Sequence, residues 1–314
     1  MVYRNTPKTQ IIFLVGPTAV GKSEVAVCLT KKINAEIISC DSMQIYKGMD
    51  IITSKPSLAL RRKIPHHLID AVSPAAEYNV SRYRRAALKK IKEVIERKKT
   101  PLFVGGTGLY MSILIDGIFK AKAEDKNIRE RLYKEAKQKG NEYLYIKLKK
   151  VDPEAAVKIH PNDTKRIVRA LEVFESTGKT ISYLQKQRIG LTEKYEVRIF
   201  CLDIKRDKLY KRINERVERM FSKGLEREVK GLLKERLSRT AAFAIGIKEL
   251  KGYFDGLYSL EEAKRLMKRN TRQYAKRQIT WFRKGKRINR INIKEEEKPK
   301  DIAKNLWKEL CLLP

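Results

Sequence analysis

The segment Gly16-Pro-Thr-Ala-Val-Gly-Lys22-Ser23 is the most informative part of the sequence about the fold. It follows the apolar run Ile11–Val15 and leads into Glu24–Thr30, so a strand, a glycine-rich turn and a helix are predicted in that order. The turn fits the phosphate-loop pattern G-x-x-x-x-G-K-[ST]. Its glycines allow a backbone path that a β-carbon would block, and its N–H groups then converge on an anion at the positive end of the helix dipole. The stretch predicts a diphosphate or triphosphate site.

Two side chains of this loop carry the expected chemistry. Lys22 supplies a positive charge, and Ser23 supplies a hydroxyl that can bind Mg²⁺. The predicted phosphate-binding loop residues are Gly16, Thr18, Ala19, Val20, Gly21, Lys22 and Ser23. The loop alone does not decide which phosphate compound is bound, so a small-molecule kinase that uses ATP fits it as well.

Further along the chain, two more predicted strands end in candidate site residues. One covers residues 35–42 and ends near Asp41, and the other begins at Pro101 and ends in the turn Gly105-Gly-Thr-Gly108. Ligands of open α/β sheets bind beyond the carboxyl ends of strands, which places Asp41 near the phosphate loop. The glycines of the second turn would let a ligand approach the backbone, where Thr107 offers a hydroxyl. We expect an α/β fold, a P-loop NTPase-like parallel sheet flanked by helices.

Composition indicates a soluble protein with a polyanionic partner. The 314 residues, 42% hydrophobic, suit a large domain with a smaller one, and 71 Lys and Arg against 37 Asp and Glu give a net charge of +34. Such a charge favours nucleic acid, then an anionic membrane surface, with lysine-rich bias as the alternative. No apolar run suits a signal peptide or a membrane span, so we expect a cytoplasmic protein without membrane contact. Four scattered cysteines predict neither a disulfide framework nor a zinc site.

The pattern of helices and strands predicts an interrupted core. Residues 1–119 would form its first part, residues 120–194 an inserted all-helical subdomain, and residues 195–314 its second part with basic C-terminal helices. Residues 195–204 are expected to return to the sheet, and residues 288–293 to form an edge strand. The predicted helix 264–283 carries basic residues at helical spacing and no acid, a stripe suited to phosphate backbones.

Several longer motifs resemble those of the tRNA dimethylallyltransferase family, also called the tRNA isopentenyltransferases. They are D-S-M-Q-I-Y-K-G-M-D from Asp41, P-H-H-L-I-D from Pro65, G-G-T-G-L-Y from Gly105, H-P-N-D from His160, R-I-x-R-A-L-E-V from Arg166 and R-x-Y-A-K-R-Q-x-T-W-F-R from Arg272. The similarity runs from Ile11 to about Arg283 in the family's order. It implies transfer of a dimethylallyl group from dimethylallyl diphosphate to N6 of the adenosine 3′ of the anticodon. The implied substrates are tRNAs that read codons beginning with U, and diphosphate is released.

The resemblance also implies a role for each matching residue. The phosphate loop with Mg²⁺ at Ser23 would bind the diphosphate, and Arg216 would lie near it. Asp41 would be the general base for the N6 proton, and Thr107 would hydrogen-bond near the reacting atoms of a flipped-out adenine. The helical insertion would clamp the anticodon stem-loop from one side, and we expect a monomer. The implied RNA-contacting residues are Asp41, Ser42, Met43, Gln44, Thr107, Arg129, Lys165, Arg166, Ile167, Val168, Arg169, Lys276, Arg277, Gln278, Trp281 and Arg283.

Three other functions would each fit part of the sequence. The charge clusters argue against a small-molecule kinase, and the helical insertion argues against transfer to a free adenine nucleotide. The set formed by Lys22, Ser23, Asp41 and Thr107 argues against an RNA-binding protein without catalytic activity. One departure from the family pattern is Ile247, where a tyrosine is usual, and it puts a contact to RNA at that position in question.

Overall fold

The protein is described here from a computed structural model that covers residues 8–119 and 125–312. It divides into two compact units. The core unit consists of the described residues up to Ile115 and those from Lys194 onward, and the helical unit is Asp116–Glu193. The expected boundary at residue 120 and the N-terminal residues 1–7 lie outside the described residues. Within the described residues, no helix is both long and apolar enough to cross a membrane.

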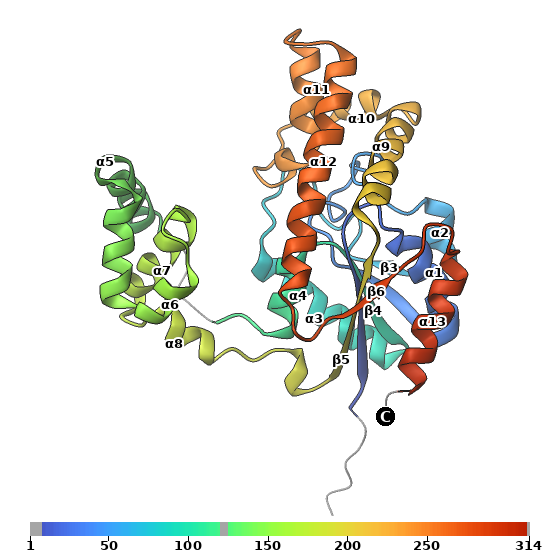
Figure 1. The fold of residues 1–314 in the computed structure, drawn as a ribbon, viewed down its shortest axis with the longest axis horizontal. Helices are drawn as coiled ribbons and strands as arrows, with labels where there is room; N and C mark the ends of the chain where they lie inside the picture. The colour runs from blue at the N-terminus through green and yellow to red at the C-terminus, as the bar shows by residue number, and fades with distance from the viewer. Residues whose placement is uncertain (1–7, 120–124, 313–314) are drawn as a thin grey trace, which may run out of the picture. The chain divides into compact units, whose positions relative to one another are not determined.

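The core unit is built on one parallel sheet, as the phosphate-loop pattern predicted. Its strand order is β3-β2-β4-β1-β5-β6, with every neighbouring pair parallel (Figure 1). Central strands of such a sheet are covered on both faces, which explains their continuous apolar runs. The predicted strand at 288–293 is confirmed as an edge strand. The strands are β1 (Gln10–Val15), β2 (Ala35–Ser39), β3 (His66–His67), β4 (Thr100–Gly105), β5 (Glu196–Asp203) and β6 (Asn289–Asn292).

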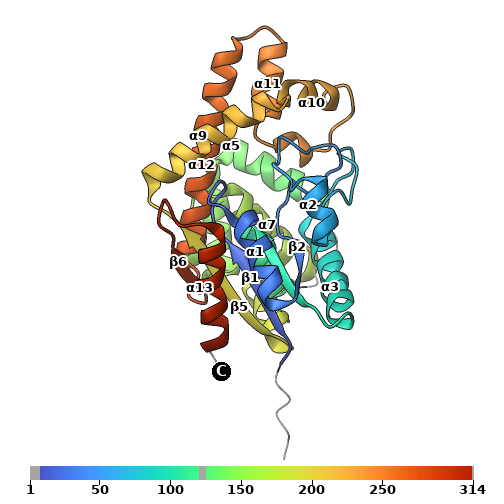
Figure 2. The same cartoon turned by 90° about the vertical axis from the view of Figure 1, so that its right-hand side faces the viewer.

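Helices cover both faces of this sheet. On one face α1 and α13 pack side by side, and they bury Leu29 and Leu306 against the strands (Figure 2). Side chains alternate along a strand, so the other face carries Phe13 and Phe103, whose rings stack with centroids 4.6 Å apart. The helices of the core unit are α1 (Lys22–Ile33), α2 (Leu58–Lys63), α3 (Val80–Glu96), α4 (Gly108–Ile115), α9 (Arg206–Ser222), α10 (Leu225–Leu232), α11 (Ile247–Phe254), α12 (Leu260–Arg283) and α13 (Pro299–Leu312).

The basic helix α12 begins earlier than its charge pattern suggests. Ser259 caps it by accepting a hydrogen bond from the N–H of Glu262, so the helix starts at Leu260 instead of Lys264. Its first turn carries Glu261 and Glu262, which suit the positive end of the helix dipole. The helix packs against α9 and α11, and this packing fixes which of its side chains reach the sheet.

The helical unit has its own apolar core. Leu132, Leu144 and Leu148 of α5 pack there with Ile167 and Leu171 of α7. A kink at Gly140, with φ of 83°, interrupts α5. The helices of this unit are α5 (Lys126–Val151), α6 (Pro153–Lys158), α7 (Thr164–Thr177) and α8 (Ile181–Lys186), followed by the 3₁₀ turn Leu191–Glu193.

Candidate active site

The phosphate loop joins β1 to α1 with the geometry that its sequence predicts. Gly16 has φ of +144°, and a Cβ there would lie 2.6 Å from the carbonyl oxygen of Leu202 on β5. Gly21, at φ of +101°, precedes α1, and no side chain caps this helix. The N–H groups of the first turn therefore keep no side-chain acceptor, which leaves the helix N-terminus suited to an anion.

Two cations lie together at this loop. The Nζ of Lys22 donates to the carbonyl oxygens of Gly16 (2.9 Å) and Pro17 (2.7 Å), and Arg216 approaches from α9. Burial lowers the pKa of Lys22 to about 8, Asp41 opposes this shift and Arg216 adds to it. Burial also lowers the pKa of Arg216, whose guanidinium forms no hydrogen bond or ion pair with any described residue. Two cations held without a carboxylate contact form an anion site.

Gln278 of α12 ties the phosphate loop to the turn that follows β4. Its Oε1 accepts from the N–H of Thr18 (2.9 Å), and its Nε2 donates to the carbonyl oxygen of Gly106 (2.9 Å). The side chain is 6% exposed. The resemblance implied that Gln278 contacts RNA, but both ends of its amide are already bonded within the protein. In this structure its role is to position the two turns.

Asp41 and Thr107 meet where β2 and β4 end. The Oδ1 of Asp41 accepts from the N–H groups of Met43 (2.8 Å) and Gln44 (3.3 Å), and the Oγ1 of Thr107 accepts from the N–H of Ser42 (3.0 Å). The hydroxyl of Tyr274 on α12 reaches Thr107, and burial raises the pKa of this tyrosine, with Asp41 adding to the shift. The structure thus brings the two predicted catalytic residues together beside the phosphate loop. The motif that begins at Arg272 contains Tyr274, but nothing in the local sequence indicates its contact with Thr107, which is distant along the chain.

The glycines of the turn after β4 have a different role from the predicted one. A Cβ at Gly105 would lie 2.0 Å from the carbonyl oxygen of Cys40, and a Cβ at Gly108 would lie 2.3 Å from the indole of Trp281. Protein atoms therefore fill the space that was expected to admit a ligand. The close contact with Gly108 also fixes Trp281 beside Thr107, with 37% of the tryptophan exposed.

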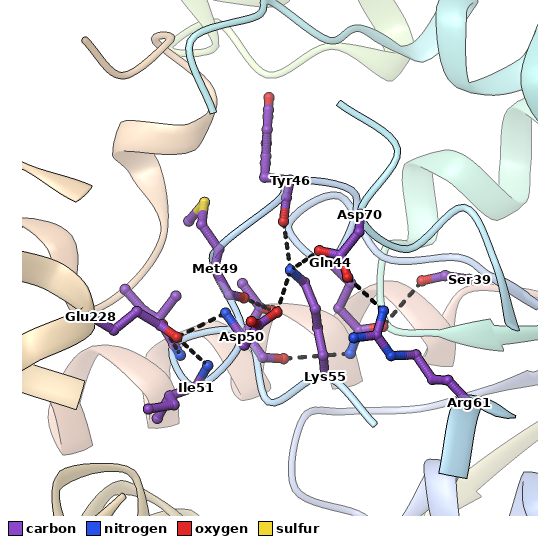
Figure 3. A network of polar contacts seen from close by, with 12 residues as sticks. Ser39, Gln44, Tyr46, Met49, Asp50, Ile51, Lys55, Arg61, Asp70 and Glu228 are labelled. Atoms are coloured by element: carbon purple, nitrogen blue, oxygen red, sulfur yellow. Dashed lines mark hydrogen bonds and ion pairs between the residues drawn. The ribbon is translucent and has the colours of Figure 1, made fainter. Parts of the chain in front are cut away.

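A polar network holds the loop that follows β2, as Figure 3 shows. Lys55 donates to the carbonyl oxygen of Tyr46 (2.6 Å), to Asp50 (2.8 Å) and to Asp70, and Arg61 pairs with the other oxygen of Asp70. Burial raises the pKa of Asp70, but the hydrogen bonds from Lys55 and Arg61 outweigh burial and lower this pKa below its usual value. The lysine therefore anchors a loop whose beginning carries Asp41.

Glu228 of α10 provides a second anchor for the same loop (Figure 3). Its Oε2 accepts from the N–H groups of Asp50 (3.0 Å) and Ile51 (2.8 Å), and its Oε1 accepts from that of Ile52 (2.9 Å). One carboxylate thus satisfies three successive backbone donors. Sequence reasoning missed Glu228 because nothing local connects it with residues more than 170 positions earlier.

A Glu228→Gln variant tests this anchor. An amide offers one acceptor oxygen, so at least one of the three backbone donors faces an NH₂ group. We expect kcat to fall roughly 10- to 100-fold through misplacement of the loop, with KM for the diphosphate substrate unchanged. Glu226→Gln on the same helix is the matched control, and steady-state kinetics measure both. An unchanged kcat in Glu228→Gln would show that the loop holds its position without this carboxylate.

The residues expected to contact RNA divide into surface and interior groups. Ile167 and Val168 are 0% and 1% exposed, because five consecutive positions of a helix necessarily include inward-facing ones. Their side chains build the core of the helical unit and do not lie on its surface. Ile247, at the start of α11, is also buried. The exposed members of the expected set are Lys165, Arg166, Lys276, Arg277, Trp281 and Arg283, and the half-buried members are Asp41, Ser42, Met43, Gln44, Thr107, Arg129 and Arg169.

A family model described as IPP transferase matches residues 44–285, and one described as isopentenyl transferase matches residues 9–64. The chain belongs to the IPP transferase family. Among curated members of this family, a tRNA dimethylallyltransferase of Halothermothrix orenii is 49% identical over 287 residues, covering 90% of this chain and 87% of that protein. One of Alkaliphilus oremlandii is 44% identical over 305 residues, covering 96% and 97%. The resemblance found in the motifs is thereby confirmed.

Solved structures of the IPP transferase family share the fold. The tRNA isopentenylpyrophosphate transferase of Bacillus halodurans matches with a TM-score of 0.69 at 38% identity, covering 97% of this chain and 98% of that one. A eukaryotic dimethylallyltransferase, solved as snapshots of its action on tRNA, matches with a TM-score of 0.76 at 32% identity, covering 90% and 74%. These matches confirm the predicted parallel sheet flanked by helices.

Proposed function

We propose that this protein transfers a dimethylallyl group from dimethylallyl diphosphate to N6 of the adenosine 3′ of the anticodon, in tRNAs that read codons beginning with U. One observation carries this proposal. In a member of the IPP transferase family, Lys22 and Arg216 lie near the charge of Asp41, yet neither cation forms an ion pair with a carboxylate of the described residues. A cationic site bordered by a carboxylate suits a substrate whose anionic group leaves while a nucleophile loses a proton.

In the proposed complex, the phosphate loop and Arg216 bind the diphosphate. Mg²⁺ would be held by the hydroxyl of Ser23 and by substrate oxygens, and it would neutralise charge on the leaving diphosphate. The residues fit this ion, because Mg²⁺ keeps several waters and needs few protein ligands when phosphates are present. The proposed diphosphate-binding residues are Gly16, Thr18, Ala19, Val20, Gly21, Lys22, Ser23 and Arg216.

Asp41 would take the proton from N6 as the new bond forms. The N6 lone pair attacks C1 of the dimethylallyl group, the C1–O bond breaks, and its electron pair leaves with the diphosphate. The Oδ1 of Asp41 is occupied by two backbone N–H groups, so Oδ2 is the oxygen left to accept the proton. Thr107 would hydrogen-bond near the reacting atoms from the adjoining turn.

The RNA would bind to the exposed cations of the expected set, with the target adenine flipped out of its stack. Lys276, Arg277 and Arg283 lie exposed along α12, and Lys165 and Arg166 lie exposed on the helical unit. The helical unit would clamp the anticodon stem-loop from one side. The proposed enzyme is a monomer that acts on tRNA in the cytoplasm.

The low pKa of Lys22 predicts how substrate binding depends on pH. The free enzyme holds the Lys22 charge below pH 8 and loses it as the pH rises through about 8. A bound diphosphate restores the charge, so binding above this pH takes up a proton. We expect the Kd for dimethylallyl diphosphate to be constant near neutral pH and to rise above pH 8. Titration calorimetry at pH 8.5 in buffers of different ionisation enthalpy measures the proton uptake that accompanies binding. Equal binding heats in all buffers would contradict the prediction.

The direct test of the function combines the protein, Mg²⁺, dimethylallyl diphosphate and unmodified tRNA. The RNA is then digested and its nucleosides are weighed by mass spectrometry. An adenosine heavier by one C₅H₈ unit, found at the position 3′ of the anticodon, is the expected result. Unmodified RNA, together with ATP consumption when small metabolites are offered, would favour a kinase instead.

A further inference from the structure

One carboxylate of the helical unit is buried in an unusual arrangement. Glu172 of α7 is 1% exposed, and its Oε2 accepts from the Nε (3.1 Å) and Nη2 (2.8 Å) of Arg129 on α5. The same oxygen lies 3.1 Å from the Nη1 of Arg169, three residues earlier on α7. The other oxygen, Oε1, is buried and has no hydrogen-bond partner among the described residues. Two arginines therefore share one oxygen of this carboxylate.

This arrangement is poorly suited to stability alone. Burying a carboxylate is costly unless hydrogen bonds satisfy both of its oxygens, and replacing buried ion pairs by apolar side chains is often neutral or stabilising. What the arrangement does achieve is orientation. It holds guanidinium groups from two different helices at one point, while their side chains remain 29% and 34% exposed. Arg169 uses a single nitrogen for this contact, so most of its five N–H donors point elsewhere.

We propose that Glu172 is a positioning residue for tRNA binding, which holds Arg129 and Arg169 in the orientation that contacts RNA phosphates. The inference rests on the proposed function, because it takes tRNA as the ligand of these two arginines. Planar guanidinium groups bind phosphate oxygens in pairs, and an orientation fixed beforehand saves the entropy of ordering them. Arg166, by contrast, is 70% exposed, and among the described residues it forms an ion pair with Asp163, the N-cap residue of α7.

The proposal predicts that the Glu172→Gln substitution weakens tRNA binding, whereas the change in charge alone would strengthen it. Replacing Glu172 by Gln removes a negative charge from a protein of net charge +34, which by long-range electrostatics should strengthen binding to RNA. If Glu172 orients the two arginines, the same substitution weakens binding. We expect the Kd for tRNA to rise about fivefold or more, and the slope of log Kd against log salt concentration to fall by roughly one unit for each RNA phosphate that the variant no longer binds.

The experiment compares Glu172→Gln with Glu175→Gln, which removes the same charge from a more exposed carboxylate that pairs with Arg131. The Kd for unmodified tRNA is measured over a salt series, together with steady-state kinetics. For Glu172→Gln we expect Kd and KM for tRNA to rise, with kcat and KM for dimethylallyl diphosphate unchanged. For Glu175→Gln we expect tRNA binding that is equal to or tighter than that of the wild type.

A second variant covers the case in which Glu172→Gln destabilises the helical unit. Arg169→Lys keeps the charge but loses the forked geometry, so the proposal predicts weaker tRNA binding, while Arg131→Lys serves as its control. Binding by Glu172→Gln as tight as that of the wild type, with an unchanged circular dichroism spectrum, overturns the inference. Should that variant not fold, an unchanged Kd in Arg169→Lys overturns it. A wild-type protein that binds tRNA without modifying it would instead refute the proposed function.

Discussion

Replacing Asp41 by Asn is expected to lower the rate of transfer to tRNA by about 10²–10⁴-fold, the range that general base catalysis contributes. The substitution is nearly isosteric. The Oδ1 of the asparagine can still accept from the N–H groups of Met43 and Gln44, so the turn at the end of β2 is kept. What is lost is an oxygen that can take the N6 proton. We therefore expect tRNA affinity to be kept while turnover is lost.

Single-turnover kinetics at neutral pH and saturating dimethylallyl diphosphate measure this effect. The conditions matter because the Asp41 charge raises the pKa of Lys22, so the variant also binds diphosphate less well at higher pH. Asp255→Asn is the matched control, since it makes the same change in charge at an exposed aspartate that pairs with Lys251. If Asp41→Asn modified tRNA at a rate near that of the wild type, Asp41 would not be the base.

Replacing Arg216 by Met is expected to stabilise the protein and at the same time to weaken its activity. Arg216 has no hydrogen bond or ion pair among the described residues, and burial lowers its pKa. A partly buried cation without a partner is destabilising, so its removal should raise the temperature of unfolding. The same removal takes a charge away from the proposed diphosphate site, and we expect kcat/KM for dimethylallyl diphosphate to fall by about 10²-fold or more.

The experiment pairs thermal unfolding with kinetics. Arg219→Met, one turn further along α9 at an exposed position, is the control and should change neither quantity appreciably. Inorganic diphosphate should raise the unfolding temperature of the wild type, because a ligand that binds the native state stabilises it, and should do so much less in Arg216→Met. A variant that unfolds at a lower temperature and keeps its activity would assign Arg216 to structure instead of the anion site.

The sequence predicts those parts of the fold that depend on short, continuous segments of the chain. The phosphate loop, the strand that ends near Asp41 and the basic helix α12 each rest on fewer than about 25 consecutive residues, where hydrophobic period and turn residues are informative. Local patterns place boundaries less well. The basic helix was predicted from Lys264, but it begins at Leu260, because the side chain of Ser259 caps it by accepting from the N–H of Glu262.

The parts that sequence reasoning missed depend on contacts between distant residues. Gln278 bonds to Thr18 across 260 positions, and no pattern within α12 distinguishes it from its exposed neighbours. The same holds for Glu228, and for the glycines of the turn after β4, which are needed because Cys40, Gln278 and Trp281 occupy the adjoining space. Packing between elements decides these roles, and packing is not visible in a single segment.

The order of the strands has a consequence for synthesis on the ribosome. β1 pairs with β4 on one side and with β5 on the other, where Gln10 is opposite Glu196. The whole helical unit, Asp116–Glu193, is translated before β5 emerges. Until then the strand that leads into the phosphate loop has one open edge, and open edges are templates for aggregation. The nascent chain must therefore carry an unfinished sheet through the time needed to make the helical unit, and β6, which pairs with β5, is translated later still.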